Sequence, residues 1–138
     1  MLNYFLLSSK DRVSEWKKLR KNLTNAIPVK NKCKLIVDFW KHAPISTKTL
    51  LDWDDCESWP TAWELLDKNN YCYSSLALGM FYSLFYAQDP IQENLLQLCL
   101  INCQSHSWQH ICLLVDNCWM LNYEHGDRKS TRLNSSHM

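Results

Sequence analysis

Glycine is almost missing from this chain of 138 residues, which contains two glycines and four prolines. Flexible linkers and disordered segments are rich in glycine, proline and polar residues, whereas 46% of this chain is hydrophobic. The composition therefore excludes a linker or a disordered tail. We expect one globular domain with a single core.

Long apolar runs are missing too. The apolar stretch at residues 95–101 is interrupted by polar residues well before the roughly 20 residues that a bilayer-spanning helix needs. The apolar patch at residues 1–9 has no basic residues before it and no small-residue cleavage site after it. We expect no membrane span, no secretory signal and a cytoplasmic location.

The chain also lacks an excess of charge of one sign, with 15 basic and 14 acidic residues. Residues 127–138 resemble a translated sequencing adapter, so we expect residues 1–126 to be a domain truncated at its C-terminus and residues 127–138 to be a non-native tail. Without this tail, 12 basic and 13 acidic residues remain. Neither balance indicates nucleic-acid binding, and the local cluster of Lys17, Lys18, Arg20 and Lys21 is typical of a solvated helix face.

Cysteine, by contrast, is plentiful, with seven residues. The odd count and the missing export signal favour free thiols in a reducing compartment. Most of these side chains are expected to behave as small buried apolar residues. That group comprises Cys33, Cys56, Cys99, Cys103, Cys112 and Cys118.

Apolar residues recur at helical spacing in residues 9–25, 32–40 and 72–86, and the last segment is apolar enough to be a central buried helix. Residues 45–60 are irregular and predict a loop. Thr61, with Glu64 three residues later, has the pattern of a capping box that begins a short helix.

Strands are predicted near the C-terminal end of the domain. Residues 95–103 favour a strand, and residues 110–115 and 118–123 flank Asp116-Asn117, whose residues tolerate the positive φ of a two-residue hairpin turn. In that register His110 lies opposite Tyr123, and Ile111 lies opposite Asn122.

One segment carries a resemblance to a known family. Residues 59–66 read Trp-Pro-Thr-Ala-Trp-Glu-Leu-Leu and are followed by Cys72 and Ala77. This order and spacing resemble the bacterial transglutaminase-like cysteine proteinases, over roughly residues 35–123. The chain departs from the family pattern in Asn70-Tyr71 before the cysteine, in Tyr73-Ser74 after it, and in an asparagine where the family has its third catalytic residue.

The resemblance implies an α+β, papain-like fold and a catalytic set of Cys72 as nucleophile, His110 as base and Asn122 as the group that orients the imidazole. A cysteine attacks as its thiolate, which a helix N-terminus and a nearby imidazolium stabilise, and Cys72 is expected at the start of its helix. Asn122 needs only to accept a hydrogen bond from the imidazole. His106 is an alternative base.

The implied activity is hydrolysis of a peptide or isopeptide bond in a protein or peptide substrate, or transfer of the acyl group to an amine. We expect no cofactor and no nucleic-acid partner. One alternative is an inactive domain of the same fold that serves as an interaction or structural protein. Another is a zinc site, because cysteine and histidine residues recur at spacings of four, three and four: Cys99, Cys103, His106 and His110.

Overall fold

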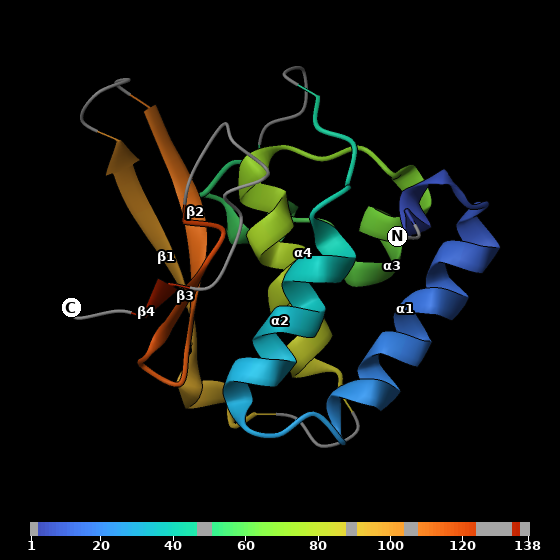
Figure 1. Ribbon diagram of the computed structural model, residues 1–138. Helices are drawn as coiled ribbons and strands as arrows, with labels where there is room; N and C mark the ends of the chain where they lie inside the picture. Colours follow the sequence, from blue (N-terminus) through green and yellow to red (C-terminus); the bar gives the residue numbers. More distant parts are fainter. Residues whose placement is uncertain (1–2, 47–50, 88–90, 104–107, 124–133, 136–138) are drawn as a thin grey trace.

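The computed structural model describes residues 3–46, 51–87, 91–103, 108–123 and 134–135. It is an α+β structure in which a group of helices lies beside a small antiparallel sheet (Figure 1). The helices are α1 (Ser9–Leu23), α2 (Val29–Trp40), α3 (Ala62–Lys68) and α4 (Tyr73–Phe85), with 3-10 turns η1 (Tyr4–Leu6), η2 (Cys56–Ser58) and η3 (Glu93–Leu95). The strands are β1 (Leu96–Cys103), β2 (Trp108–Val115), β3 (Trp119–Leu121) and β4 (Asn134–Ser135).

The predicted helices are confirmed, and local hydrogen bonds explain where they begin. The Ser8 hydroxyl accepts a hydrogen bond from the Asp11 N–H at the start of α1. At the start of α3 the capping box is complete, because the Thr61 hydroxyl accepts from the Glu64 N–H and the Glu64 carboxylate accepts from the Thr61 N–H. These bonds satisfy N–H groups that have no partner within the helix.

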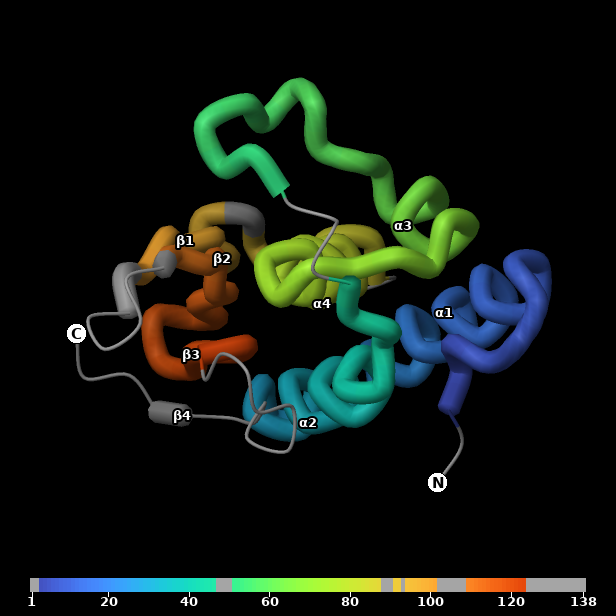
Figure 2. Tube along the Cα trace, turned by 90° about the horizontal axis from the view of Figure 1, so that it is seen from above, coloured from blue at the N-terminus to red at the C-terminus, as the bar shows by residue number. Residues whose placement is uncertain are grey.

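Helix α4 lies at the centre of the molecule, between the sheet and the other helices (Figure 2). It contacts α1, α2, α3, β1 and β2, and most of its side chains are buried. A polar contact fixes this packing: the indole N–H groups of Trp16 on α1 and Trp40 on α2 both donate to the Ser83 hydroxyl, each at 2.9 Å. Three helices are therefore joined at one buried oxygen.

The sheet has the order β1-β2-β3-β4, and the predicted strands are confirmed. Asp116 and Asn117 have φ values of 56° and 54°, and the Cys118 N–H donates to the Val115 carbonyl at 3.0 Å, but the turn between the paired residues contains three residues, 116–118, instead of the predicted two. The predicted register is wrong by one residue. Val115 pairs with Trp119 because Cys118 belongs to the turn and not to the ladder.

The two faces of the sheet have different neighbours. Leu113, Val115 and Leu121 pack in the large core with the helices. Cys112, Leu114 and Met120 form a separate small cluster on the opposite face. Because side chains alternate along a strand, His110 shares its face of β2 with Cys112 and Leu114.

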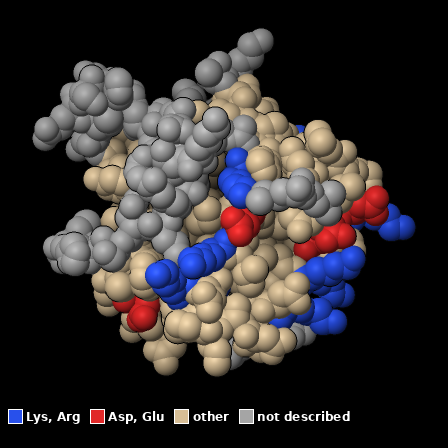
Figure 3. Space-filling view, in the orientation of Figure 1, with Lys and Arg blue, Asp and Glu red and all other residues tan. Residues whose placement is uncertain are grey.

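On the face of the molecule shown in Figure 3, acidic and basic side chains are interspersed. None of the helices in the described ranges is both long and apolar enough to cross a membrane. The short strand β4 lies beside β3, within the stretch expected to be a non-native tail.

Candidate active site

Cys72 is the N-cap of α4, as the sequence predicts. The preceding residue, Tyr71, is fully buried and holds this position through backbone bonds: its carbonyl accepts from the Ser46 N–H at 2.7 Å, and its N–H donates to the Pro44 carbonyl at 3.2 Å. The Tyr71 ring packs edge-on against Phe5. Helix α4 therefore starts from an anchored residue, which holds the backbone at Cys72 in place.

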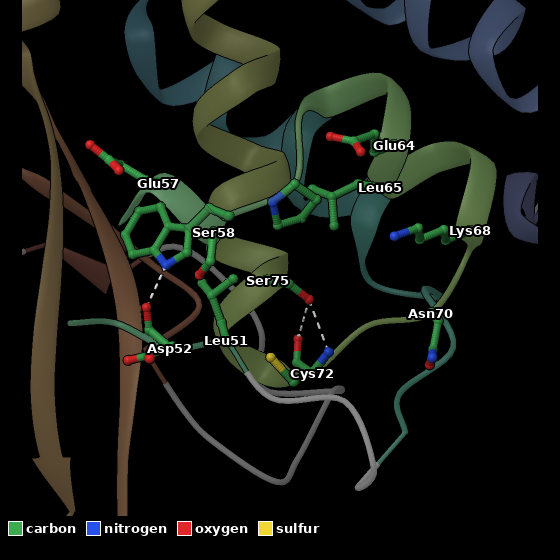
Figure 4. Close-up of a pocket in the computed structure, with 12 residues that line it drawn as sticks. Leu51, Asp52, Glu57, Ser58, Glu64, Leu65, Lys68, Asn70, Cys72 and Ser75 are labelled. Carbon is green, nitrogen blue, oxygen red and sulfur yellow. Dashed lines mark hydrogen bonds between the residues drawn. The ribbon is translucent and has the colours of Figure 1, made fainter. Parts of the chain in front are cut away.

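Ser75 supports the backbone of Cys72 (Figure 4). The Ser75 hydroxyl accepts from the Cys72 N–H at 2.9 Å and donates to the Cys72 carbonyl at 2.9 Å. Its place three residues after the N-cap is a recognisable capping position. Sequence reasoning missed Ser75, although this spacing was a usable signal.

The first turn of α4 is attached directly to strand β2. The Ser74 hydroxyl accepts from the Ile111 N–H at 3.0 Å. The Asn122 side-chain amide donates to the Ile111 carbonyl at 3.1 Å and to the Tyr73 carbonyl at 2.6 Å. Since β3 ends at Leu121, side chains from α4 and from Asn122 replace a strand as partners of Ile111. These bonds fix the Cys72 helix against the strand that carries His110.

Asn122 contacts His110, but not with the atom that was predicted. The His110 Nε2 lies 3.0 Å from the backbone carbonyl of Asn122, so this nitrogen carries the proton and donates it. The side-chain nitrogen of Asn122 donates to the backbone carbonyls of Tyr73 and Ile111, so the predicted acceptance of a ring proton by the side-chain oxygen stays a prediction. The left-handed backbone of Asn122, with φ 63°, turns the carbonyl and the side chain in different directions.

Burial lowers the pKa of His110, and hydrogen bonds to the backbone of Asn122 and Tyr123 raise it by less. The folded protein therefore favours the neutral imidazole. With the proton on Nε2, the lone pair of the ring lies on Nδ1, which is buried in the structure.

Cys112 is a thiol in contact with the His110 ring. Its Sγ lies 3.5 Å from His110 Nε2 and 3.1 Å from the Asn122 carbonyl. Burial, with a smaller effect of the neighbouring Cys99, raises the pKa of Cys112 to about 12. A fully buried thiol with so high a pKa is not a nucleophile. None of the hydrogen bonds formed by the described residues joins the Cys72 thiol to the His110 ring.

Cys72 lines two adjoining cavities, although only 7% of the residue is exposed. One cavity, of about 420 Å³, is also lined by His110. The other, of about 540 Å³, is lined by Trp59 and by charged side chains, and the sulfur of Cys72 points into it (Figure 4). The structure therefore brings Cys72 and His110 to one cavity and brings His110 and Asn122 into direct contact.

In the described part of the chain, no three His, Cys, Asp or Glu side chains lie close enough together to hold a metal ion, so the predicted zinc site is not supported there. Cys99 lies on β1 opposite Cys112. The side chain of Cys103 and the whole of His106 lie outside the described residues. His106 as the alternative base therefore stays a prediction.

No known protein family, no curated protein sequence and no solved structure matches the chain.

Proposed function

We propose that the chain is a papain-like cysteine hydrolase that cleaves a peptide or isopeptide bond, or transfers the acyl group to an amine. The observation that carries the proposal is the cavity that Cys72 and His110 both line, at the N-terminus of a buried helix. The resemblance to transglutaminase-like cysteine proteinases supports the same assignment of nucleophile and base.

In the proposed reaction the neutral His110 imidazole accepts the Cys72 proton at Nδ1, and the thiolate attacks the carbonyl carbon of the substrate. N–H groups at the start of α4 would stabilise the oxyanion. The imidazolium then gives its proton to the leaving amine. Water, or a second amine, attacks the thioester and restores the cysteine.

Asn122 would act in this reaction as a positioning residue. Its backbone carbonyl holds the proton on Nε2, and its side chain joins the first turn of α4 to β2. The reaction also requires the imidazole and the Cys72 thiol to meet in the shared cavity. Hydrogen bonds of this kind are often long without substrate and shorten in the Michaelis complex.

A comparison of two cysteines tests the nucleophile. Cys56 is exposed and Cys72 is buried, so accessibility alone predicts that iodoacetamide modifies Cys56 first. An activated Cys72 should instead react first at about pH 6, where ordinary thiols are protonated. The modified positions are read by peptide mass spectrometry, with Cys56→Ser as the control variant. Modification of Cys56 before Cys72 would contradict the proposal.

A second candidate function is supported by the strand geometry. The face of β2 that carries His110 also carries Cys112, and the ring contacts that inert thiol. An interaction domain that retains the fold without the chemistry would show this arrangement. Such a domain would have no imidazole-dependent reactivity at Cys72.

A further inference from the structure

We propose that the cavity into which the Cys72 sulfur points binds the side chain of a lysine or an arginine in a peptide ligand. The proposal rests on the proposed hydrolase function only in making that peptide a substrate. Binding itself depends on the charges and the walls of the cavity of about 540 Å³, and it is tested without any cleavage.

Carboxylates outnumber cations in this cavity. Asp52, Glu57 and Glu64 line it, and among the described residues that line it Lys68 is the one cation. Hydrogen bonds with Thr61 lower the pKa of Glu64, and the charge of nearby Lys68 lowers it further, so this lysine offsets Glu64. None of the ion pairs formed by the described residues involves Asp52 or Glu57. These two carboxylates therefore give the cavity an unbalanced negative charge.

The other walls of the cavity suit a long basic side chain. Leu51, Pro60 and Leu65 line it, so apolar surface lies beside the carboxylates. Lysine and arginine have the same dual character, because an apolar stem carries the charge at its end. A compact cation would leave the apolar surface uncovered. The volume of about 540 Å³ lies within the range of ligand sites, roughly 300–1,000 Å³.

Trp59 holds the acidic side of the cavity against the protein. Its indole N–H donates to the Asp52 carbonyl at 2.7 Å, and its ring packs against the core. Figure 4 shows Asp52 and Glu57 on one side of the cavity and Lys68 on the other. Aromatic rings attract cations, so Trp59, which also lines the cavity, favours a basic ligand on the acidic side.

The Cys72 thiol is a feature of this cavity that is independent of its carboxylates. Cys72 is 7% exposed, and its sulfur points into the cavity (Figure 4). A ligand bound in the cavity therefore covers the thiol. In the proposed reaction a bound basic side chain brings a neighbouring peptide bond to this sulfur, so the substrate is a peptide cut close to a lysine or an arginine.

Two thiol reagents of similar size and opposite charge test the sign of the charge in the cavity. Methanethiosulfonates that carry a trimethylammonium or a sulfonate group both form a mixed disulfide with a thiolate and release methanesulfinate. The rates at Cys72 are read by peptide mass spectrometry, and their ratio is divided by the ratio for a free thiol in solution. We expect a preference for the cationic reagent of roughly 10-fold or more, which weakens as salt rises.

A double substitution of Asp52→Asn and Glu57→Gln removes the unbalanced charge and should abolish the preference. Both residues are exposed, so the fold should be retained. The matched control is the double substitution of Asp54→Asn and Asp55→Asn, because these exposed carboxylates belong to the same loop and do not line the cavity. The control should keep most of the preference. An unchanged preference after loss of Asp52 and Glu57, or no reaction of either reagent at Cys72, would overturn the proposal.

Protection by peptides identifies the ligand and separates this proposal from the hydrolase function. A short peptide with blocked termini and one central lysine should slow the alkylation of Cys72 by iodoacetamide, whereas the same peptide with norleucine in place of lysine should not. Equal protection by the two peptides would overturn the proposal. Protection by the lysine peptide without its cleavage would support the binding and contradict the hydrolase function. Cleavage that depends on Cys72 but is equal for the two peptides would do the reverse.

Discussion

Replacing Asn122 with aspartate separates two roles for this residue. If the side chain oriented the imidazole by accepting a hydrogen bond from the ring, a carboxylate would serve as well, because its oxygens also accept hydrogen bonds. In the structure the side chain donates instead, to the Tyr73 carbonyl at 2.6 Å and to the Ile111 carbonyl at 3.1 Å. A carboxylate has no proton to donate. Asn122→Asp should therefore weaken the protein.

The size of the effect follows from burial. Asn122 is 1% exposed, so water cannot replace the lost donors. The Ile111 carbonyl loses a buried donor, which costs about 1–3 kcal/mol of unfolding free energy at neutral pH; the Tyr73 carbonyl is only part-buried and belongs to α4, so it adds less. Natural domains have about 5–15 kcal/mol in total. The variant should lose a substantial part of its stability.

The loss should also depend on pH. A carboxyl group buried against two carbonyls binds a proton more tightly in the folded state than in the unfolded state, where its pKa is about 3.9. The folded variant then holds more protons, so its stability falls as pH rises above about 4, and part of the deficit disappears as pH falls towards that value.

Urea denaturation of the wild type and Asn122→Asp at about pH 7 and pH 4.5 measures these differences. Asn117→Asp is the control, since Asn117 has a similar positive φ of 54° but is exposed in the hairpin turn. It should change stability by no more than about 0.5 kcal/mol. Equal stability of the two variants would refute the donor role of Asn122.

Three further perturbations test the core and the imidazole. Ser83→Ala leaves two buried indole N–H groups without their acceptor and should cost about 2–5 kcal/mol in urea denaturation, whereas the exposed control Ser14→Ala on α1 should cost less than about 0.5 kcal/mol. Gly79→Ala places a methyl group 2.7 Å from the Trp40 ring, and this clash should lower the unfolding free energy by about 1–3 kcal/mol even though alanine is the better helix former. A variant more stable than the wild type would show that the Trp40 ring moves aside. Burial lowers the pKa of His110, so at mildly acidic pH the unfolded chain binds a proton at His110 more readily than the folded chain does. The unfolding free energy should therefore fall as pH drops below about 6.5. His110→Gln should make the unfolding free energy less dependent on pH between about pH 7.5 and 5. An unchanged slope in the variant would assign the pH dependence to other groups.

Local chemistry is what made the helices predictable from the sequence. Two signals involve only residues that are close in sequence: the capping pattern of Thr61 and Glu64, and the helical spacing of apolar residues after Cys72. Both can therefore be recognised without knowledge of the tertiary structure. The Asp116-Asn117 turn is predictable for the same reason.

The candidate site was only partly predictable, because it depends on register. One residue of the turn, Cys118, shifts the pairing of β3 against β2, and an error of one residue changes which face a side chain is on. The left-handed backbone of Asn122 follows from the end of β3 and from its contacts with α4. Contacts between distant segments, such as Ser74 with Ile111, have no local signature.

The central claim is that His110 activates Cys72. It is tested most directly by the rate at which iodoacetamide alkylates Cys72 in the wild type and in His110→Gln, with Cys56 in the same molecule as an internal standard. The proposed site predicts that the variant loses the rapid reaction at Cys72 while Cys56 reacts at an unchanged rate, because thiolate formation needs the imidazole base. Equal Cys72 rates in the two proteins would contradict the claim and favour a domain without catalytic activity.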